Sequence, residues 1–208
     1  MKKLVILLVV LFLIPVFLGA QTIENLDFIS PFNDGLSAIK KDNQWAFINQ
    51  EGSIVLNFRN DLVTTKFNDG NYPIFINKRC LISKEIDGIS YFGYIDTSGK
   101  TIIDPVFLNA QNFENNEAIV LKLTQEIIGK NDVLGKNIVQ YKYYEVTIDT
   151  DGNINQYLTP KGFNLILDKK YLKIPPEITS RRISDNLYAI YGENKNWTII
   201  KTINANQL

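Results

Sequence analysis

The chain has 208 residues, and its 22 basic side chains balance 22 acidic ones. This neutrality argues against a nucleic-acid or anionic-membrane partner, because such proteins carry a dense basic surface. The chain contains no histidine, which excludes Ser-His-Asp and Cys-His catalysis and removes the usual ligands of zinc and non-haem iron. Cys80 is the single cysteine, and we expect an ordinary loop or strand residue there, with a disulfide to another chain as the alternative.

The first 20 residues have the pattern of a secretory signal peptide, with two lysines, an apolar stretch at residues 4–18 and small residues before the cut. The apolar stretch is short for a membrane span and contains Pro15, so we expect cleavage after Ala20, with an uncleaved anchor as the alternative. The mature chain, residues 21–208, would have a net charge of −2 and the size of one domain.

The mature chain is expected to be almost entirely β-strand. Its short segments are rich in β-branched and aromatic residues and are bounded by turn residues, and no helical period of useful length follows the signal peptide. The expected strands are residues 37–40, 45–48, 54–58, 74–76, 91–95, 101–103, 118–121, 143–148, 165–167, 187–191 and 197–202.

Two stretches share one order of residue types. Trp45–Ile48 leads to a turn at Gly52, and Phe92–Ile95 leads to a turn at Gly99, with an isoleucine-containing strand after each turn. Such a recurrence is the sequence signature of a repeat protein.

Two more copies are degenerate. In copy three, which ends at Gly152, Glu145 holds the aromatic position, and in copy four Asn204 replaces the glycine of the turn. Asparagine is the residue that best replaces glycine at positive φ. Each copy also has a head, an apolar residue followed by turn residues, at Phe32–Gly35, Phe67–Gly70, Phe113–Asn116 and Ile183–Asn186.

This pattern resembles the WG-repeat family of bacterial proteins over most of residues 32–204. The resemblance rests on the head, and on a tail of the form Trp-Gly-Phe-Ile-Asp with a turn glycine, although the dipeptide Trp-Gly itself does not occur. The resemblance implies a WG-like β-repeat domain at residues 21–208. It implies no single activity and no catalytic residues, because the family is not tied to one function.

The expected fold is therefore all-β, with about four tandem repeats of antiparallel three-stranded meanders stacked or curled into one array. A four-bladed propeller is the alternative. Copies two and three are longer than copies one and four, which predicts added loops at Asn77–Ser90 and Lys122–Lys142. Insertions in repeat proteins often carry the binding surface.

The second insertion ends at Tyr141 and Tyr143, which share one face of a strand because they are two residues apart. We expect these tyrosines to be the binding residues, although the insertion could instead cover a sheet edge. No catalytic residue, metal ligand or cofactor is predicted.

The expected function is a non-catalytic binding or scaffold module of the bacterial cell envelope, exported to the periplasm or the medium, with a protein or glycan partner. No nucleic-acid partner and no stable membrane insertion after signal cleavage are expected. The alternative is a carboxylate-based hydrolase of envelope glycans, which needs two acids about 5–10 Å apart.

Overall fold

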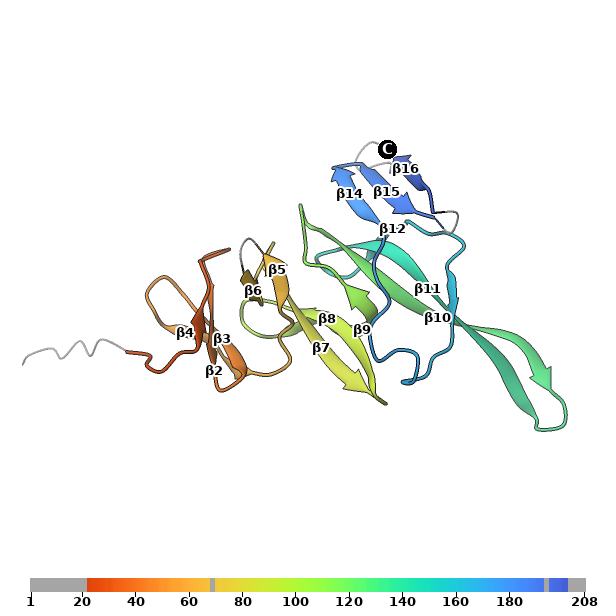
Figure 1. Cartoon of the computed structure of the whole chain (residues 1–208), viewed down its shortest axis with the longest axis horizontal. Helices are drawn as coiled ribbons and strands as arrows, with labels where there is room; N and C mark the ends of the chain where they lie inside the picture. Colours follow the sequence, from red (N-terminus) through yellow and green to blue (C-terminus); the bar gives the residue numbers. More distant parts are fainter. Residues whose placement is uncertain (1–21, 68–69, 193–194, 202–208) are drawn as a thin grey trace, which may run out of the picture.

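The computed structural model describes residues 22–67, 70–192 and 195–201, so the expected signal peptide lies outside the described residues. The described residues form only β-strands and connections, with no helix long and apolar enough to cross a membrane. Their strands build several antiparallel sheets and no closed barrel or propeller. Figure 1 shows these sheets following one another along the molecule. The expected all-β array of repeats is confirmed, and it is open.

Copy one is a sheet of four strands in the order β1-β2-β3-β4. Asp42 and Asn43 join its central hairpin, and both have positive φ, as a two-residue turn between twisted strands requires. The strands are β1 (Phe28–Ile29), β2 (Ser37–Lys41), β3 (Gln44–Ile48) and β4 (Ile54–Arg59).

Copies two and three share one seven-stranded sheet in the order β12-β11-β10-β9-β8-β7, with β13 pairing β11 beside that path. The sheet is continuous because the tail strand of copy two, β9, extends to pair with the head strand of copy three, β10. Its strands are β7 (Cys80–Ile86), β8 (Ile89–Ile95), β9 (Thr101–Ala110), β10 (Glu117–Asn131), β11 (Lys136–Asp149), β12 (Ile154–Tyr157) and β13 (Phe163–Leu165).

Two smaller sheets complete the described part. A hairpin of β5 and β6 lies between copies one and two in the sequence, and copy four forms a three-stranded sheet in the order β14-β15-β16. The expected tail turn of copy four, at Asn204, lies outside the described residues. The strands are β5 (Thr65–Phe67), β6 (Gly70–Tyr72), β14 (Arg181–Ser184), β15 (Leu187–Tyr191) and β16 (Trp197–Lys201).

The tail turns of the first three copies have one geometry. Asn49, Asp96 and Asp149 each open the turn, and each side chain accepts the backbone N–H of the residue four positions later. The glycine of each turn has positive φ, where a side chain would be strained. These turns confirm the alignment of the three tails: Gly52 at 78°, Gly99 at 86° and Gly152 at 88°.

The head of copy two differs from the sequence prediction. Phe67 and Gly70 pair with each other in the β5–β6 hairpin. The head turn instead spans Ile76–Arg79, whose end residues exchange two backbone hydrogen bonds, as the head turns of copies one and three do. Asn77 and Lys78 hold positive φ there without any glycine, so the sequence signal for the turn was weak.

Neither predicted insertion is a loop. Residues 77–90 contain the end of the head turn, the strand β7 and the Asp87-Gly88 hairpin turn. Residues 122–142 belong to a long hairpin in which β10 pairs with β11 from Glu117 and Asp149 to Asn131 and Lys136. Its outer part, residues 125–140, is called the arm below, and Figure 1 shows it projecting from the sheet.

Neighbouring copies are held by equivalent aromatic contacts. Phe47 packs edge-on against Phe75, the head aromatic of copy two, with ring centroids 4.7 Å apart. Tyr94 packs against Phe113, the head aromatic of copy three, at the same distance. All four rings are almost fully buried, so the apolar core is divided into layers between successive copies.

The head turns also contact one another in sequence. The carboxylate of Asp34 accepts the backbone N–H of Lys78, and the side chain of Asn77 accepts the backbone N–H of Asn116. From copy three, the Asn115 amide donates to the carboxylate of Asp185 in copy four. Equivalent positions of four copies thus form one hydrogen-bonded series along the array.

Candidate functional site

Tyr143 lies on the inner part of β11 and is half-buried. Its ring stacks on Phe163 of β13, with centroids 5.2 Å apart, and it packs beside the cluster that contains the buried Leu172. Burial, followed by the nearby charge of Glu145, raises the pKa of the Tyr143 hydroxyl. The structure therefore places this predicted binding residue in packing contacts.

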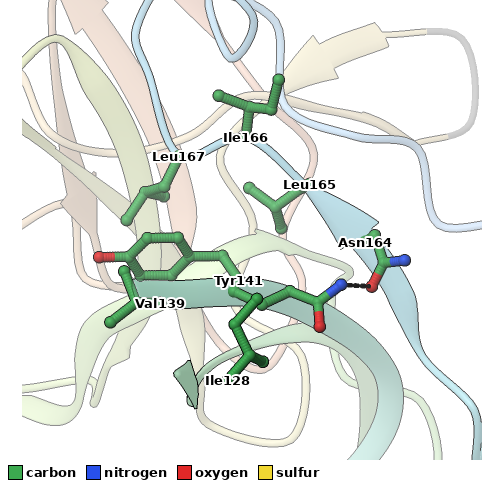
Figure 2. Close-up of a pocket in the computed structure, with 8 residues that line it drawn as sticks. Ile128, Val139, Tyr141, Asn164, Leu165, Ile166 and Leu167 are labelled. Carbon is green, nitrogen blue, oxygen red and sulfur yellow. Dashed lines mark hydrogen bonds between the residues drawn. The ribbon is translucent and has the colours of Figure 1, made fainter. Parts of the chain in front are cut away.

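Tyr141 lies two residues away and lines an open groove of about 530 Å³. Figure 2 shows its ring between Val139 of the arm and Leu165 and Leu167 of the segment that follows β12. Ile128 of the arm lies on another side of the groove. The structure thus separates the two predicted tyrosines, and only Tyr141 reaches the groove.

The groove exists because the chain after β12 returns across the sheet. It runs along the outer edge of β11, pairs with it as β13, and turns away at Asp168, whose carboxylate accepts the backbone N–H of Lys170. Leu172 then inserts into the core on this side of the sheet. Residues 158–180, called the cover segment below, therefore form one wall of the groove, and the arm forms the other.

Glu145 anchors the far end of the cover segment. Its carboxylate is fully buried and accepts both the backbone N–H and the hydroxyl of Thr179, and the backbone N–H of Ser180, each at 2.8 Å. The hydroxyl of Thr159 accepts the backbone N–H of Glu145 itself. These bonds satisfy a buried charge that would otherwise destabilise the fold. The sequence indicated this anchor only by placing a carboxylate at a position that is aromatic in copies one and two.

A second hollow, of about 160 Å³, lies between copies three and four and is lined by Glu114 and Glu117. The Glu117 carboxylate accepts the hydroxyl of Tyr188 at 2.6 Å and the amide of Asn155 at 2.8 Å, and Arg182 lies 3.9 Å away. Burial, followed by the hydrogen bond to Glu117, raises the pKa of Tyr188. Glu117 is thus engaged in joining two copies.

A third hollow, of about 300 Å³, is lined by two acids from different elements. Asp87 belongs to the hairpin turn of copy two, and Asp168 belongs to the cover segment. Tyr91 lines the same hollow, and burial, followed by the charge of Asp87, raises its pKa. This is the place where the carboxylate-hydrolase alternative can be tested.

Two other expectations concern the single cysteine, Cys80, and metal sites. Cys80 begins β7 and is fully buried, which confirms a strand residue, and burial raises the pKa of its thiol. Within residues 22–67, 70–192 and 195–201, no group of three or more metal-binding side chains is found.

Comparison with known proteins identifies repeat units. Residues 23–45 and 92–122 match the family model described as WG containing repeat. No curated protein and no solved structure matches the chain. The second matched stretch runs from β8 of copy two to β10 of copy three and contains both Tyr94 and Phe113. The sequence unit therefore spans the contact between two structural copies.

Proposed function

We propose that this chain, which matches the WG-repeat family model at residues 23–45 and 92–122, is an exported, non-catalytic binding or scaffold module of the bacterial cell envelope. Its partner is a protein or a glycan, bound at the groove between the arm and the cover segment. The observation that carries this proposal is the open groove of about 530 Å³, with Tyr141 in its wall.

The groove is suited to binding because it is not used for stacking the copies. The rings of Phe47 and Tyr94 are occupied by the next head aromatic, and Glu117 is occupied by copy four. The groove instead lies on the face that the cover segment only partly encloses. Open, mainly apolar hollows with a few polar groups are the usual form of binding sites.

A direct test compares two tyrosine variants of the mature chain, residues 21–208. Tyr141→Ser removes the partly buried ring from the groove wall, and Tyr171→Ser removes a more exposed ring, 59% exposed, outside the groove. The probes are purified cell-wall glycan and an extract of envelope proteins, each assayed by co-sedimentation or pull-down. We expect binding to one of them to fall about tenfold with Tyr141→Ser and to be unchanged with Tyr171→Ser.

The same glycan incubation tests the enzymatic alternative. If soluble sugar fragments are released and Asp168→Asn abolishes their release, the protein is a hydrolase that uses the hollow of Asp87 and Asp168. Equal binding by both tyrosine variants would instead remove the groove from the proposal.

Export is tested separately. The protein is purified from the envelope and the medium of the cells that make it, and its N-terminus is sequenced. We expect Gln21 or its cyclised form as the first residue. Recovery of full-length chain in the cytosolic fraction would contradict export without affecting the groove.

A further inference from the structure

We infer that the groove binds an extended polypeptide segment of a partner protein, which adds as a strand to the outer edge of β11 at residues 136–140. This inference rests on the proposed binding function and chooses the protein partner over the glycan. It is based on the edge of β11, on the lining of the groove and on the exposure of the arm.

The outer edge of β11 is covered in succession by the returning chain. β12 pairs with Val146–Ile148, and β13 pairs with Tyr141–Tyr143. The chain leaves the edge after Leu165, and among the described residues no strand pairs with the outer edge of 136–140. Backbone groups there point outward at alternate residues and can pair with another strand. A partner strand would extend the line that β13 begins.

The arm has apolar side chains that the described fold leaves in water. Ile127 is 66% exposed, Ile128 is 59% exposed and Ile138 is 47% exposed. The arm contains no proline that would block strand addition, and its cross-strand pairing keeps it extended. A long, exposed, apolar edge favours pairing with another chain.

The groove lies where the vacant edge begins. Tyr141 is opposite Leu165 in the ladder, and Val139 is the next residue of β11 on the same face. An added strand in line with β13 would therefore place one of its side chains opposite Val139 and beside Tyr141. That side chain would enter the groove between the arm and Leu167. Strand addition with alternate side chains in pockets is an established mode of peptide recognition.

The lining favours an aliphatic or aromatic side chain over a sugar. Ile128, Val139 and the residues Leu165–Leu167 are aliphatic, and Tyr141 is the one aromatic residue of the groove. The groove has two polar side chains besides the Tyr141 hydroxyl, Gln140 and Asn164, and one hydrogen bond of 2.9 Å joins them, as the dashed line in Figure 2 shows. A sugar would need free polar partners and a broader aromatic platform.

The experiment uses labelled peptides of seven residues that alternate threonine and valine, with leucine or phenylalanine at the centre. Their binding to the mature chain is measured by fluorescence anisotropy. Each peptide is also made with N-methyl groups on one or the other set of alternate amides, because only one set would face β11. We expect one methylated set to lose at least tenfold in affinity and the other to change less than about threefold.

Protein variants locate the contact. Val139→Asp places a charge at the predicted side-chain position and should weaken peptide binding at least tenfold. Val133→Asp, at a residue that is 94% exposed in the turn of the arm, is the matched control and should leave binding unchanged. Circular dichroism of both variants must match the wild type, and Tyr141→Ser is measured as a second groove variant that does not alter the arm.

The outcomes separate this inference from the proposed function. Strand addition at this edge is overturned if neither methylation pattern changes the affinity of the peptide. It is also overturned if Val139→Asp and Tyr141→Ser leave peptide binding unchanged. If no peptide binds while cell-wall glycan binding depends on Tyr141, the partner is a glycan, so the inference is wrong and the proposed function stands. If no peptide and no glycan binds, and no envelope protein is retained, both are wrong.

Discussion

The contact between copies two and three and the contact between copies three and four use opposite chemistry. The first is apolar, with Tyr94 against Phe113 and further buried side chains from β9 and β10. The second has a small buried cluster, around Tyr188, and is completed by hydrogen bonds to Glu117 and Glu145. A repeat position can therefore exchange an aromatic ring for a carboxylate when a neighbouring segment supplies hydrogen-bond donors.

Residue size also differs between copies at two corresponding positions of the repeat. Thr147 takes the place that Phe47 and Tyr94 hold in the first two copies, and it is buried. Tyr188 takes the place of the small Ser37, and it is also buried. Copy three therefore lacks the large residue on its middle strand, and copy four has a large residue on its head strand instead. Thr147 and Tyr188 both line the hollow between copies three and four, so the tyrosine ring borders this hollow without filling it.

The largest expected effect comes from breaking the apolar contact. Phe113→Ala should lower the free energy of unfolding by about 3–5 kcal/mol, because it removes a buried ring and leaves a cavity beside Tyr94. Urea unfolding of the mature chain measures the change. Phe32→Ala is the control, since the equivalent head aromatic of copy one is 49% exposed. Equal losses for the two variants would show that the ring contact does not hold the copies together.

A smaller but still large effect is expected at the polar contact. Glu145→Ala removes the acceptor of three hydrogen bonds and should cost about 3 kcal/mol, because buried N–H groups of the cover segment lose their partner. Hydrogen exchange should rise at Thr179 and Ser180. Glu126→Ala, which removes an exposed carboxylate paired with Lys142, should cost less than about 1 kcal/mol. Unchanged exchange in Glu145→Ala would contradict the anchoring role.

Tyr188→Phe isolates one hydrogen bond of the polar contact, because it removes the hydroxyl and keeps the ring. We expect a loss of about 1–2 kcal/mol, because the Glu117 carboxylate loses the donor at 2.6 Å. Thermal unfolding measures it. A double variant with Glu117→Gln should cost less than the sum of the two single variants, since Glu117→Gln weakens the same hydrogen bond that Tyr188→Phe removes. Strict additivity would show that the bond contributes nothing to the contact.

The smallest expected effect is a change in how stability depends on pH, and it comes from one of the tail turns. Hydrogen bonds from the Ser98 hydroxyl and from backbone amides lower the pKa of Asp96 in the folded state. The unfolded state then binds more protons than the folded state in this pH range. The stabilisation that Asp96 contributes is therefore present above the ordinary pKa of aspartate, and it is lost as the pH falls through the lowered pKa of the folded state. Asp96→Asn should flatten the acid side of the stability curve. An unchanged slope below about pH 4 would contradict this.

Local patterns of the sequence determined the strands and the tail turns. Most of the β-branched and aromatic segments formed strands, and Gly52, Gly99 and Gly152 adopted positive φ, because both features depend mainly on neighbouring residues. Two expected strands differ: residues 74–76 lead into the head turn of copy two outside any strand, and of 165–167 only Leu165 belongs to one. The head of copy two was missed because Asn77 and Lys78 form its turn without glycine. The repeat pattern also predicted correctly that neighbouring copies pack against one another.

The tertiary structure alone decided the candidate site. Residues 122–142 extend two strands instead of forming a loop, because pairing between β10 and β11 continues beyond the rest of the sheet. Tyr141 and Tyr143 share a strand, yet the cover segment buries one against Phe163 and leaves the other in a groove. Glu145 fixes that segment across 34 residues of sequence. No local pattern encodes which face of a strand a distant segment will cover, and that choice created the groove.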